Sequence, residues 1–294
     1  MNQPVEGFQS ARPRSGSNIE VTPLTPHIGA EIGGVDLREP LSDEQLSGIK
    51  AALWSHGVIF FRDQRISFDQ HIRFARYFGE PHTHVGFKME ASHPEIRKLE
   101  ADEQSTIVAG DHWHTDQSCA PIPPMGSILH MHEVPPDGGG DTMFASMYAA
   151  YDALSPRMKA HIEGLTATHE GRAAFKRYEN APHFSGVALK DYPVAVHPVV
   201  AVHPETGRRL LYVNRDFTTR INELPEDESD ALLRFLVEHC SRAEFVVRFR
   251  WRQYSIAFWD NRCTHHKAIW DYYPHRRVGY RIQLKGTRPP IPAA

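Results

Sequence analysis

Cysteine is scarce in this chain, and the three that occur lie far apart, at Cys119, Cys240 and Cys263. No two of them form a C-x-x-C pair, so the sequence offers neither a disulfide framework nor a zinc knuckle. Few and widely spaced cysteines are typical of proteins that work in a reducing compartment, and we predict a cytoplasmic location.

Long hydrophobic runs and an excess of one charge are also absent. No window reaches 18 apolar residues, and residues 1–18 lack the apolar core of a secretory signal, so we expect no membrane span. The 33 Lys and Arg residues nearly balance the 36 Asp and Glu residues, which leaves a net charge of −3. Such a chain has no general attraction for nucleic acid or an anionic membrane, and we expect neither of them as a partner.

The chain divides into a long structured region between two short tails. Residues 1–18 are polar and contain several Ser, Gly and Pro residues, which predicts a disordered tail, and residues 289–294 form a Pro-rich tail. We expect residues 19–288 to form a single domain, because β-rich domains of more than about 200 residues are common.

Short apolar strands outnumber the helical segments and do not alternate regularly with them. This pattern predicts a mainly β fold with flanking helices, built as an antiparallel barrel or a double-sheet jelly roll. The stretches 80–110 and 169–193 have no clear period, and their length makes them candidates for lids over a site. The expected helices span about residues 43–55, 68–78, 147–165 (broken at Pro156) and 226–240. The main expected strands span residues 58–61, 125–134, 198–203, 209–214, 244–251, 255–259 and 278–284.

His114 and Asp116 form an H-x-D pair, and a strand here would direct both side chains to one face. Two ligands leave a metal ion under-coordinated, so a third must come from elsewhere, and the best candidates are His265 and His266. Two histidines with one carboxylate and open remaining positions are the ligand set of non-haem Fe(II) oxygenases. Spacing alone does not decide between the two neighbouring histidines.

A different metal chemistry is also compatible with this stretch. His112, His114 and Asp116 resemble part of the H-x-H-x-D-H motif of binuclear zinc hydrolases, since imidazoles suit zinc as well as iron. Position 117 is Gln rather than His, and the alternation of strands and helices around that motif is missing. A jelly roll that only binds an organic acid without catalysis is a second alternative.

Two arginines near the C-terminus indicate anionic ligands. Arg277, Gly279 and Arg281 share one face of a predicted strand, so both guanidinium groups would point inward with space between them. A guanidinium binds carboxylates and sulfonates through two parallel hydrogen bonds. Because the local sequence offers no acidic partner, we expect two anionic ligands; two salt-bridged barrel arginines are the alternative.

Five ordered motifs resemble those of the taurine dioxygenase family of Fe(II)/2-oxoglutarate-dependent oxygenases, over residues 19–288. The resemblance implies a double-stranded β-helix, or jelly-roll core, and a reaction that consumes 2-oxoglutarate and O2 and releases succinate and CO2. It also implies a homo-oligomer, a dimer or tetramer. The motifs are Trp113-His114-Thr115-Asp116, Gly139-Gly140-Asp141-Thr142, Tyr212-Val213-Asn214 with Phe217-Thr218-Thr219-Arg220, Trp259-Asp260-Asn261-Arg262 with Thr264-x-His266, and Arg276-Arg277-x-x-x-Arg281.

The same resemblance assigns roles to individual residues. It implies an iron held by His114, Asp116 and His266, and a distal 2-oxoglutarate carboxylate held by Thr142 and Arg277. Arg281 matches the arginine that meets the acidic group of the primary substrate. The remaining positions implied at the substrate pocket are His84, Phe87, Phe217 and Phe175.

Three positions depart from the taurine enzyme that this family includes. Gly110 stands where that enzyme has Asn, Phe87 replaces Tyr, and Ala174 replaces Ser. A site that hydrogen-bonds a polar substrate selects it through such groups, so their loss makes taurine itself doubtful. We therefore expect a larger and more apolar substrate that keeps one anionic group, of the sulfonate, alkylsulfate or carboxylate (aryloxyalkanoate) type.

Overall fold

Two sheets packed face to face form the centre of the molecule. The computed structural model describes residues 19–83, 89–176 and 191–293. The larger sheet has the strand order β1-β2-β3-β14-β6-β16-β4, with β5 also paired to β16, and the smaller sheet has the order β13-β7-β15. The strands are β1 (Glu20–Pro23), β2 (Ala30–Gly33), β3 (Val58–Phe61), β4 (Pro81–His82), β5 (Arg97–Ala101), β6 (Gly126–Glu133), β7 (Thr142–Ser146), β13 (Val246–Phe249), β14 (Ile256–Asp260), β15 (Thr264–Ala268) and β16 (Arg277–Leu284).

Side chains of the larger sheet alternate between two buried layers. On β3, Ile59 and Phe61 pack outward against helices, whereas Val58 and Phe60 pack inward against the smaller sheet. Between the sheets, the ring of Phe60 stacks on that of Phe249 with centroids 3.8 Å apart. A strand buried on both faces has a continuous apolar sequence, which is why this segment was recognisable as a strand.

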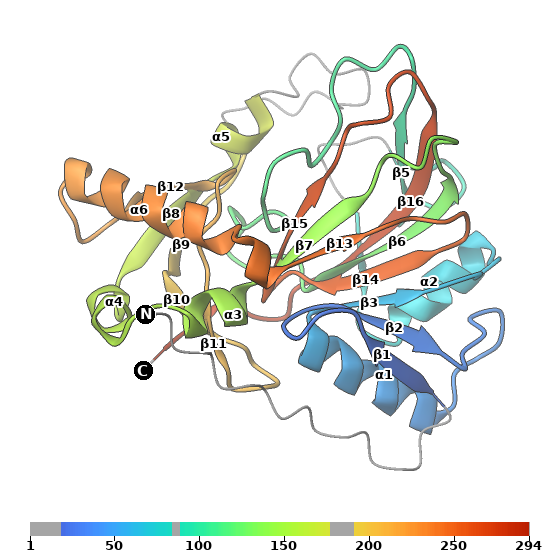
Figure 1. Cartoon of the computed structure of the whole chain (residues 1–294), viewed down its shortest axis with the longest axis horizontal. Coiled ribbons are helices and arrows are strands. Elements are labelled where there is room, and N and C mark those ends of the chain that lie inside the picture. The colour runs from blue at the N-terminus through green and yellow to red at the C-terminus, as the bar shows by residue number, and fades with distance from the viewer. Residues whose placement is uncertain (1–18, 84–88, 177–190, 294) are drawn as a thin grey trace.

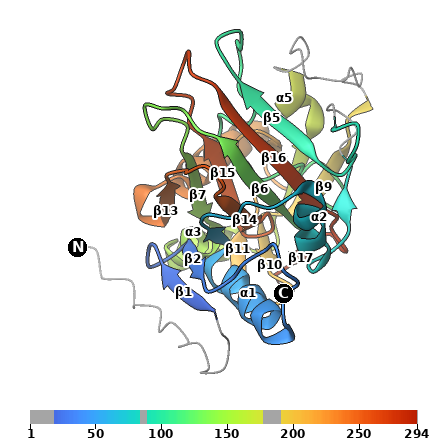
Figure 2. The same ribbon diagram turned by 90° about the vertical axis from the view of Figure 1, so that its right-hand side faces the viewer.

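Helices α1 (Asp43–His56) and α2 (Phe68–Arg76) cover the outer face of the larger sheet (Figures 1 and 2). Both begin as predicted, with a capping box in which the hydroxyl of Ser42 or Ser67 accepts the third backbone N–H of the helix. These helices leave the inner face of the sheet to the smaller sheet and to the space that holds the site.

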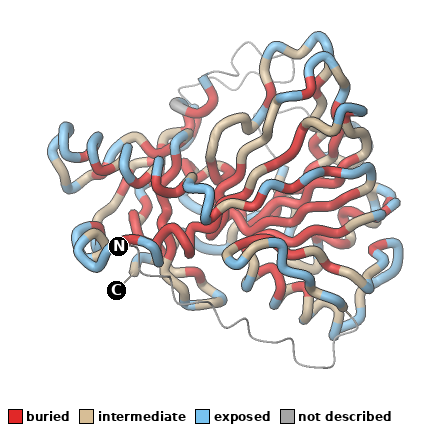
Figure 3. The backbone as a smooth tube through the Cα atoms, viewed as in Figure 1, coloured by how far each residue is buried: buried red, intermediate tan, exposed pale blue. Residues whose placement is uncertain are grey.

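A second group of elements lies beside the two sheets and has its own apolar core (Figure 1). Buried residues follow the central strands of the large sheet and continue into this second group (Figure 3). The sheet orders here are β12-β8-β9 and β11-β10-β17. The elements are α3 (Met147–Asp152), α4 (Pro156–Ile162), β8 (Thr166–Glu170), α5 (Gly171–Phe175), β9 (Val194–Pro198), β10 (Val200–Val202), β11 (Arg209–Leu211), β12 (Thr218–Ile221), α6 (Glu226–Cys240), the short η3 (Ala243–Phe245) and β17 (Ile291–Pro292).

The predicted mainly β class with flanking helices is confirmed, but two stretches expected to be irregular contain regular elements. Region 80–110 holds β4 and β5, and region 169–193 holds the end of β8 and all of α5. Strand β5 was missed because its sequence is mostly charged: Lys98 and Glu100 pair with each other at 2.6 Å. None of the helices in the described part of the chain is long and apolar enough to cross a membrane.

Several imidazoles are enclosed in this fold. His71 on α2 and His130 on β6 are 0 % and 1 % exposed, and His130 Nδ1 lies 3.1 Å from His132 Nε2. Burial lowers the pKa of His71 well below its ordinary value and lowers the pKa of His130 to about 3. Burial likewise lowers the pKa of His169 and of His265 to about 3. These side chains are therefore neutral in the folded protein, even in mild acid.

Mild acid should consequently destabilise the fold. Below about pH 6.5 the unfolded chain binds protons at these histidines and the folded chain does not. The free energy of unfolding therefore decreases as the pH is lowered. Each such histidine contributes up to about 1.4 kcal/mol per pH unit. Urea unfolding at about pH 7.5, 6.5 and 5.5 measures the slope.

The slope should become shallower in His130→Gln and remain unchanged in His161→Gln, which alters an exposed histidine. A free energy of unfolding that stays constant from about pH 6.5 to 5.5 would show that the buried histidines are protonated in the folded state.

Candidate active site

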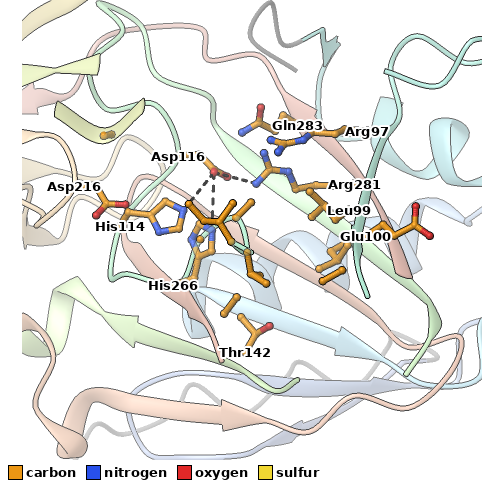
Figure 4. Close-up of a pocket in the computed structure, with 18 of the residues that line it drawn as sticks. Arg97, Leu99, Glu100, His114, Asp116, Thr142, Asp216, His266, Arg281 and Gln283 are labelled. Atoms are coloured by element: carbon orange, nitrogen blue, oxygen red, sulfur yellow. Dashed lines mark hydrogen bonds and ion pairs between the residues drawn. The ribbon is translucent and has the colours of Figure 1, made fainter. Parts of the chain in front are cut away.

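The side chains of His114, Asp116 and His266 converge on one point between the two main sheets (Figure 4). Two backbone hydrogen bonds join His114 to His266: the His114 N–H donates at 3.1 Å, and the His266 N–H donates in return at 2.8 Å. Residues paired in this way project to the same face, and the two imidazole centroids are 4.2 Å apart. The histidine of β15 is thereby fixed beside the histidine of the distant H-x-D segment.

The segment that carries His114 and Asp116 is not the strand that was predicted. It makes one isolated bridge at His114 and then turns, with a positive φ of 48° at Gln117. The hydroxyl of Thr115 donates to the carbonyl of Asn261 at 2.6 Å and anchors the turn to the end of β14. A turn held by a distant partner, rather than strand alternation, brings Asp116 beside His114.

The three side chains leave a shared space between their ligand atoms. Asp116 Oδ1 lies 3.9 Å from the Nε2 atom of His114 and 3.9 Å from that of His266, and the three ligand atoms lie within 4.8 Å of one another. Separations of 3.9 Å are too long for hydrogen bonds. Two imidazoles and one carboxylate fit an Fe(II) site with open positions for substrates.

Contacts behind these ligands orient them toward the shared space. His114 Nδ1 is 2.8 Å from the carbonyl of His112, which requires the proton on Nδ1 and leaves the Nε2 lone pair for a metal. The hydroxyl of Ser127 donates to Asp116 Oδ2 at 2.7 Å, so Oδ1 is the carboxylate oxygen directed at the histidines.

The charge of Asp116 is stabilised by its neighbours. Burial by itself would raise the pKa of this carboxyl, but Arg281, the two histidines and the Ser127 hydroxyl hold it well below the ordinary value. Burial lowers the pKa of His266 well below its ordinary value, and the neighbouring imidazole of His114 lowers it further. Asp116 is therefore a carboxylate and His266 a neutral imidazole at neutral pH, as metal ligation requires.

The structure separates the two neighbouring histidines of β15. His266 belongs to the ligand group, whereas His265 is the adjacent residue of the strand and points to the opposite face. His112 does not join the group either, because its Nδ1 lies 3.3 Å from Asp216 and its side chain is 42 % exposed. The described residues therefore give the binuclear zinc alternative no second ligand set at this point.

Arg277, at the start of β16, is 7 % exposed and forms no ion pair with any residue that the structure describes. Its Nε donates to the carbonyl of Gly140 at 3.0 Å, and its guanidinium lies 5.7 Å from the ring centre of Trp251. Trp251 Nε1 donates to the hydroxyl oxygen of Thr142 at 3.0 Å. Burial lowers the pKa of Arg277, because a buried charge is unfavourable. An anionic ligand would offset the free-energy cost of burying this guanidinium.

Gly140 explains the glycine-rich motif that precedes Thr142. Its φ is +82°, and a Cβ atom there would lie 2.9 Å from Cδ of Arg277. Its N–H donates to the carboxylate of Asp271 at 2.8 Å. The backbone therefore approaches the arginine so closely that only glycine fits without displacing it.

Arg281 is also buried, but it has an acidic partner. Its NH1 atom donates to Asp116 Oδ1 at 3.1 Å. The local sequence around Arg281 offered no acidic partner, because Asp116 lies 165 residues away in the sequence. Its Nε is buried with no acceptor among the described residues. One edge of this guanidinium contacts a predicted metal ligand, and the other edge still requires an acceptor.

The wall beside His114 and Asp116 is largely apolar. Phe175 and Phe217 both line the pocket, and Phe175 stacks on Tyr192 with centroids 4.4 Å apart. The other predicted pocket residues, His84 and Phe87, lie outside the residues that the structure describes. The two described phenylalanines therefore contribute aromatic surface near the ligand group.

Gly110 lines the same pocket directly beside His114. Its φ is +82°, and a Cβ atom there would lie 3.1 Å from Cε1 of His114. Its carbonyl accepts the N–H of Ala268 at 2.7 Å, which ties this loop to β15. A polar side chain at position 110 would require a strained backbone and would crowd the imidazole.

The polar residues of the pocket that were not predicted include Arg97, Gln117 and Gln283. Gln283 lies two residues beyond Arg281 on β16, so the alternation that indicated Arg281 could also have indicated Gln283. Arg97 lies opposite Arg281 on β5, and no sequence pattern indicated it because β5 itself was not predicted.

Comparisons with known proteins agree with this geometry. The family described as "Taurine catabolism dioxygenase TauD, TfdA family" matches residues 20–283. A solved taurine dioxygenase from Burkholderia xenovorans is 40 % identical, with 92 % of each chain covered and a TM-score of 0.78. An alkylsulfatase of Acinetobacter baylyi is 34 % identical over 91 % of this chain and 85 % of its own length.

A third relative is the (S)-phenoxypropionate/alpha-ketoglutarate-dioxygenase of Sphingobium herbicidovorans. It is 31 % identical over 91 % of this chain and 95 % of its own length. The solved neighbours share the jelly-roll class that was predicted from the sequence, which confirms that prediction.

Replacing His266 with Ala should lower the affinity for Mn(II) by about 100-fold or more, because one of three protein ligands is lost. Isothermal titration calorimetry without oxygen measures this directly. The matched control, His265→Ala, removes the adjacent imidazole on the opposite face and should change the affinity less than about threefold. Equal losses in the two variants would contradict the proposed geometry.

Proposed function

Because this chain belongs to the TauD, TfdA dioxygenase family, we propose that it is an Fe(II)- and 2-oxoglutarate-dependent dioxygenase that hydroxylates a small anionic organic molecule. The observation that carries the proposal is the group of two histidines and one aspartate that opens into a pocket lined by Arg277, a buried arginine without an ionic partner among the described residues. In the overall reaction, the substrate, 2-oxoglutarate and O2 yield the hydroxylated product, succinate and CO2.

In this proposal His114, Asp116 and His266 hold the iron. The bound iron and 2-oxoglutarate supply the oxidising chemistry. The protein keeps Asp116 ionised, keeps His266 neutral and fixes the His114 tautomer through the carbonyl of His112. All three residues are buried, which limits the contact of bulk water with the metal-binding atoms.

Arg277 and Thr142 hold the distal carboxylate of 2-oxoglutarate. Arg277 is a buried cation without an ionic partner among the described residues, so a carboxylate completes its environment. The oxygen of Thr142 accepts a hydrogen bond from Trp251, which leaves its own hydrogen free to be donated to a carboxylate. The two side chains therefore present donors to the same anionic group.

Arg281 binds the acidic group of the primary substrate, whose remainder lies against the apolar wall. Phe175 and Phe217 lie in this wall, in one cluster with Ala174. At position 110 the glycine offers no side chain to hydrogen-bond an amine. We therefore favour a substrate larger and more apolar than taurine.

Further features of the proposal come from the sequence. Residues 19–288 act as one domain, and the protein works in the cytoplasm as a homo-dimer or tetramer.

Arg277→Gln should raise the KM for 2-oxoglutarate by at least about 30-fold, because a buried cation that pairs with a carboxylate is lost. Succinate release at varied 2-oxoglutarate concentration measures the effect. The neighbouring Arg276→Gln removes an exposed arginine that pairs with Glu100 and Glu133, and its KM should change less than about twofold. If both variants behave alike, Arg277 does not bind the co-substrate.

Arg281→Ala should weaken primary substrate binding while some 2-oxoglutarate turnover continues without product formation. The ratio of succinate formed to substrate consumed, measured over a panel of organic acids, should therefore rise above that of the unaltered protein.

Asp116→Ala should abolish succinate formation, because a metal ligand is lost.

With the unaltered protein, kcat/KM for taurine should be at least about tenfold below that for the best acid. Comparable values would disprove the larger, apolar substrate.

A further inference from the structure

One end of the pocket gathers three polar side chains from two neighbouring strands. Arg97 on β5 pairs in register with Arg281 on β16, and residues directly opposite in antiparallel strands project to the same face. Gln283 lies two residues beyond Arg281 and therefore shares that face. Figure 4 shows the three side chains together, next to Asp116. The exposed fractions of all three residues are below one tenth.

Two donor groups in this cluster lack acceptors among the described residues. Arg281 Nε and Gln283 Nε2 are buried, and neither has a hydrogen-bond partner among the residues that the structure describes. The amide of Gln117 donates to Gln283 Oε1 at 3.0 Å, which fixes the Gln283 side chain with its NH2 group left over. Both open positions are donors, so the missing partner is an acceptor.

The charges indicate that this acceptor is an anion. The open Nε of Arg281 belongs to a guanidinium, and a charged donor binds an anionic acceptor more strongly than a neutral one. Asp116 contacts Arg281 at 3.1 Å, but the proposed metal uses the same carboxylate oxygen.

We propose that Arg97, Arg281 and Gln283 form one oxoanion subsite that selects a sulfonate or sulfate-ester head group over a carboxylate. The inference rests on the proposed function, in which Arg281 alone was assigned to the acidic group of the substrate. A carboxylate presents two oxygens in one plane, whereas a sulfonate presents three in a pyramid. Donors on three side chains from two strands suit the three-oxygen group. Gln117 acts as a positioning residue that orients Gln283.

The two anionic ligands do not compete for this subsite. Arg277 and Arg281 are four residues apart on one strand, which separates their backbones by roughly 13 Å. On the wall between them, the pocket is lined by Leu99, Ala101 and Leu129. An apolar substrate chain can therefore lie along this wall while its head group meets the subsite.

Direct binding tests the inference without relying on turnover. The full chain is loaded with Mn(II) and 2-oxoglutarate without oxygen, and calorimetry compares hexanesulfonate, hexyl sulfate and heptanoate, which share a six-carbon alkyl chain. We expect the two sulfur oxoanions to bind at least about tenfold more tightly than heptanoate. Equal or tighter binding of heptanoate overturns the inference.

Variants locate the preference on the named residues. Arg97→Gln should weaken hexanesulfonate binding by at least about tenfold and heptanoate binding by less than about threefold. Gln283→Leu should reduce the same preference, and Gln117→Leu should reduce it by a smaller factor because the amide is no longer held. Arg76→Gln, a control that removes an exposed arginine of α2, should leave it intact. A preference that survives Arg97→Gln and Gln283→Leu overturns the inference.

Affinity for 2-oxoglutarate verifies that each variant is folded, since Arg277 lies at the other end of the wall. If Arg97→Gln does not fold, Arg97→Lys replaces it and should lose part of the preference. Failure of the broader proposal has a different signature: no succinate from the iron-loaded protein with any of the three acids. Head-group preference in binding and succinate release are thus separate readouts.

Discussion

The buried carboxylate of Asp116 is the charge on which the rest of the site depends. A carboxylate at 5 % exposure is costly unless donors and cations surround it, and here Arg281, Ser127 and two imidazoles do so. Ser127 belongs to β6, Arg281 to β16 and His266 to β15. One short turn is therefore held by electrostatic contacts to both main sheets, and loss of this carboxylate would remove the acidic partner that the described residues give the buried guanidinium of Arg281.

The sequence was most informative where one strand or one motif carries the geometry. The apolar run at residues 58–61 correctly predicted a central strand, because a strand that is buried on both faces has a continuous apolar sequence. The helix starts near residues 43 and 68 were predictable because each depends on a capping contact only three residues apart, at Ser42 and at Ser67. The face shared by Arg277 and Arg281 likewise follows from the two-residue period of a single strand.

The sequence was least informative where contacts join distant segments. No local pattern connects Arg281 to Asp116 or Thr115 to Asn261, and these contacts replace the predicted strand at His114 with a bridge and a turn. Arg97 remained hidden because β5 is a strand only through its pairing with β16, since its own residues are mostly charged. The choice of His266 over His265 likewise depended on family resemblance, and the fold supplies the physical reason in the opposite faces of adjacent residues.

Strand β16 is hydrogen-bonded along both edges, by β5 on one side and β6 on the other. A strand held in this way cannot slide or tilt without breaking the hydrogen bonds along both of its edges. The distance between Arg277 and Arg281 is therefore fixed. Altered substrate preference in this protein would then arise through exchange of side chains around this arginine pair, at positions such as 97 or 217. Evolution could thus change which molecule is oxidised while the co-substrate end of the pocket stays constant.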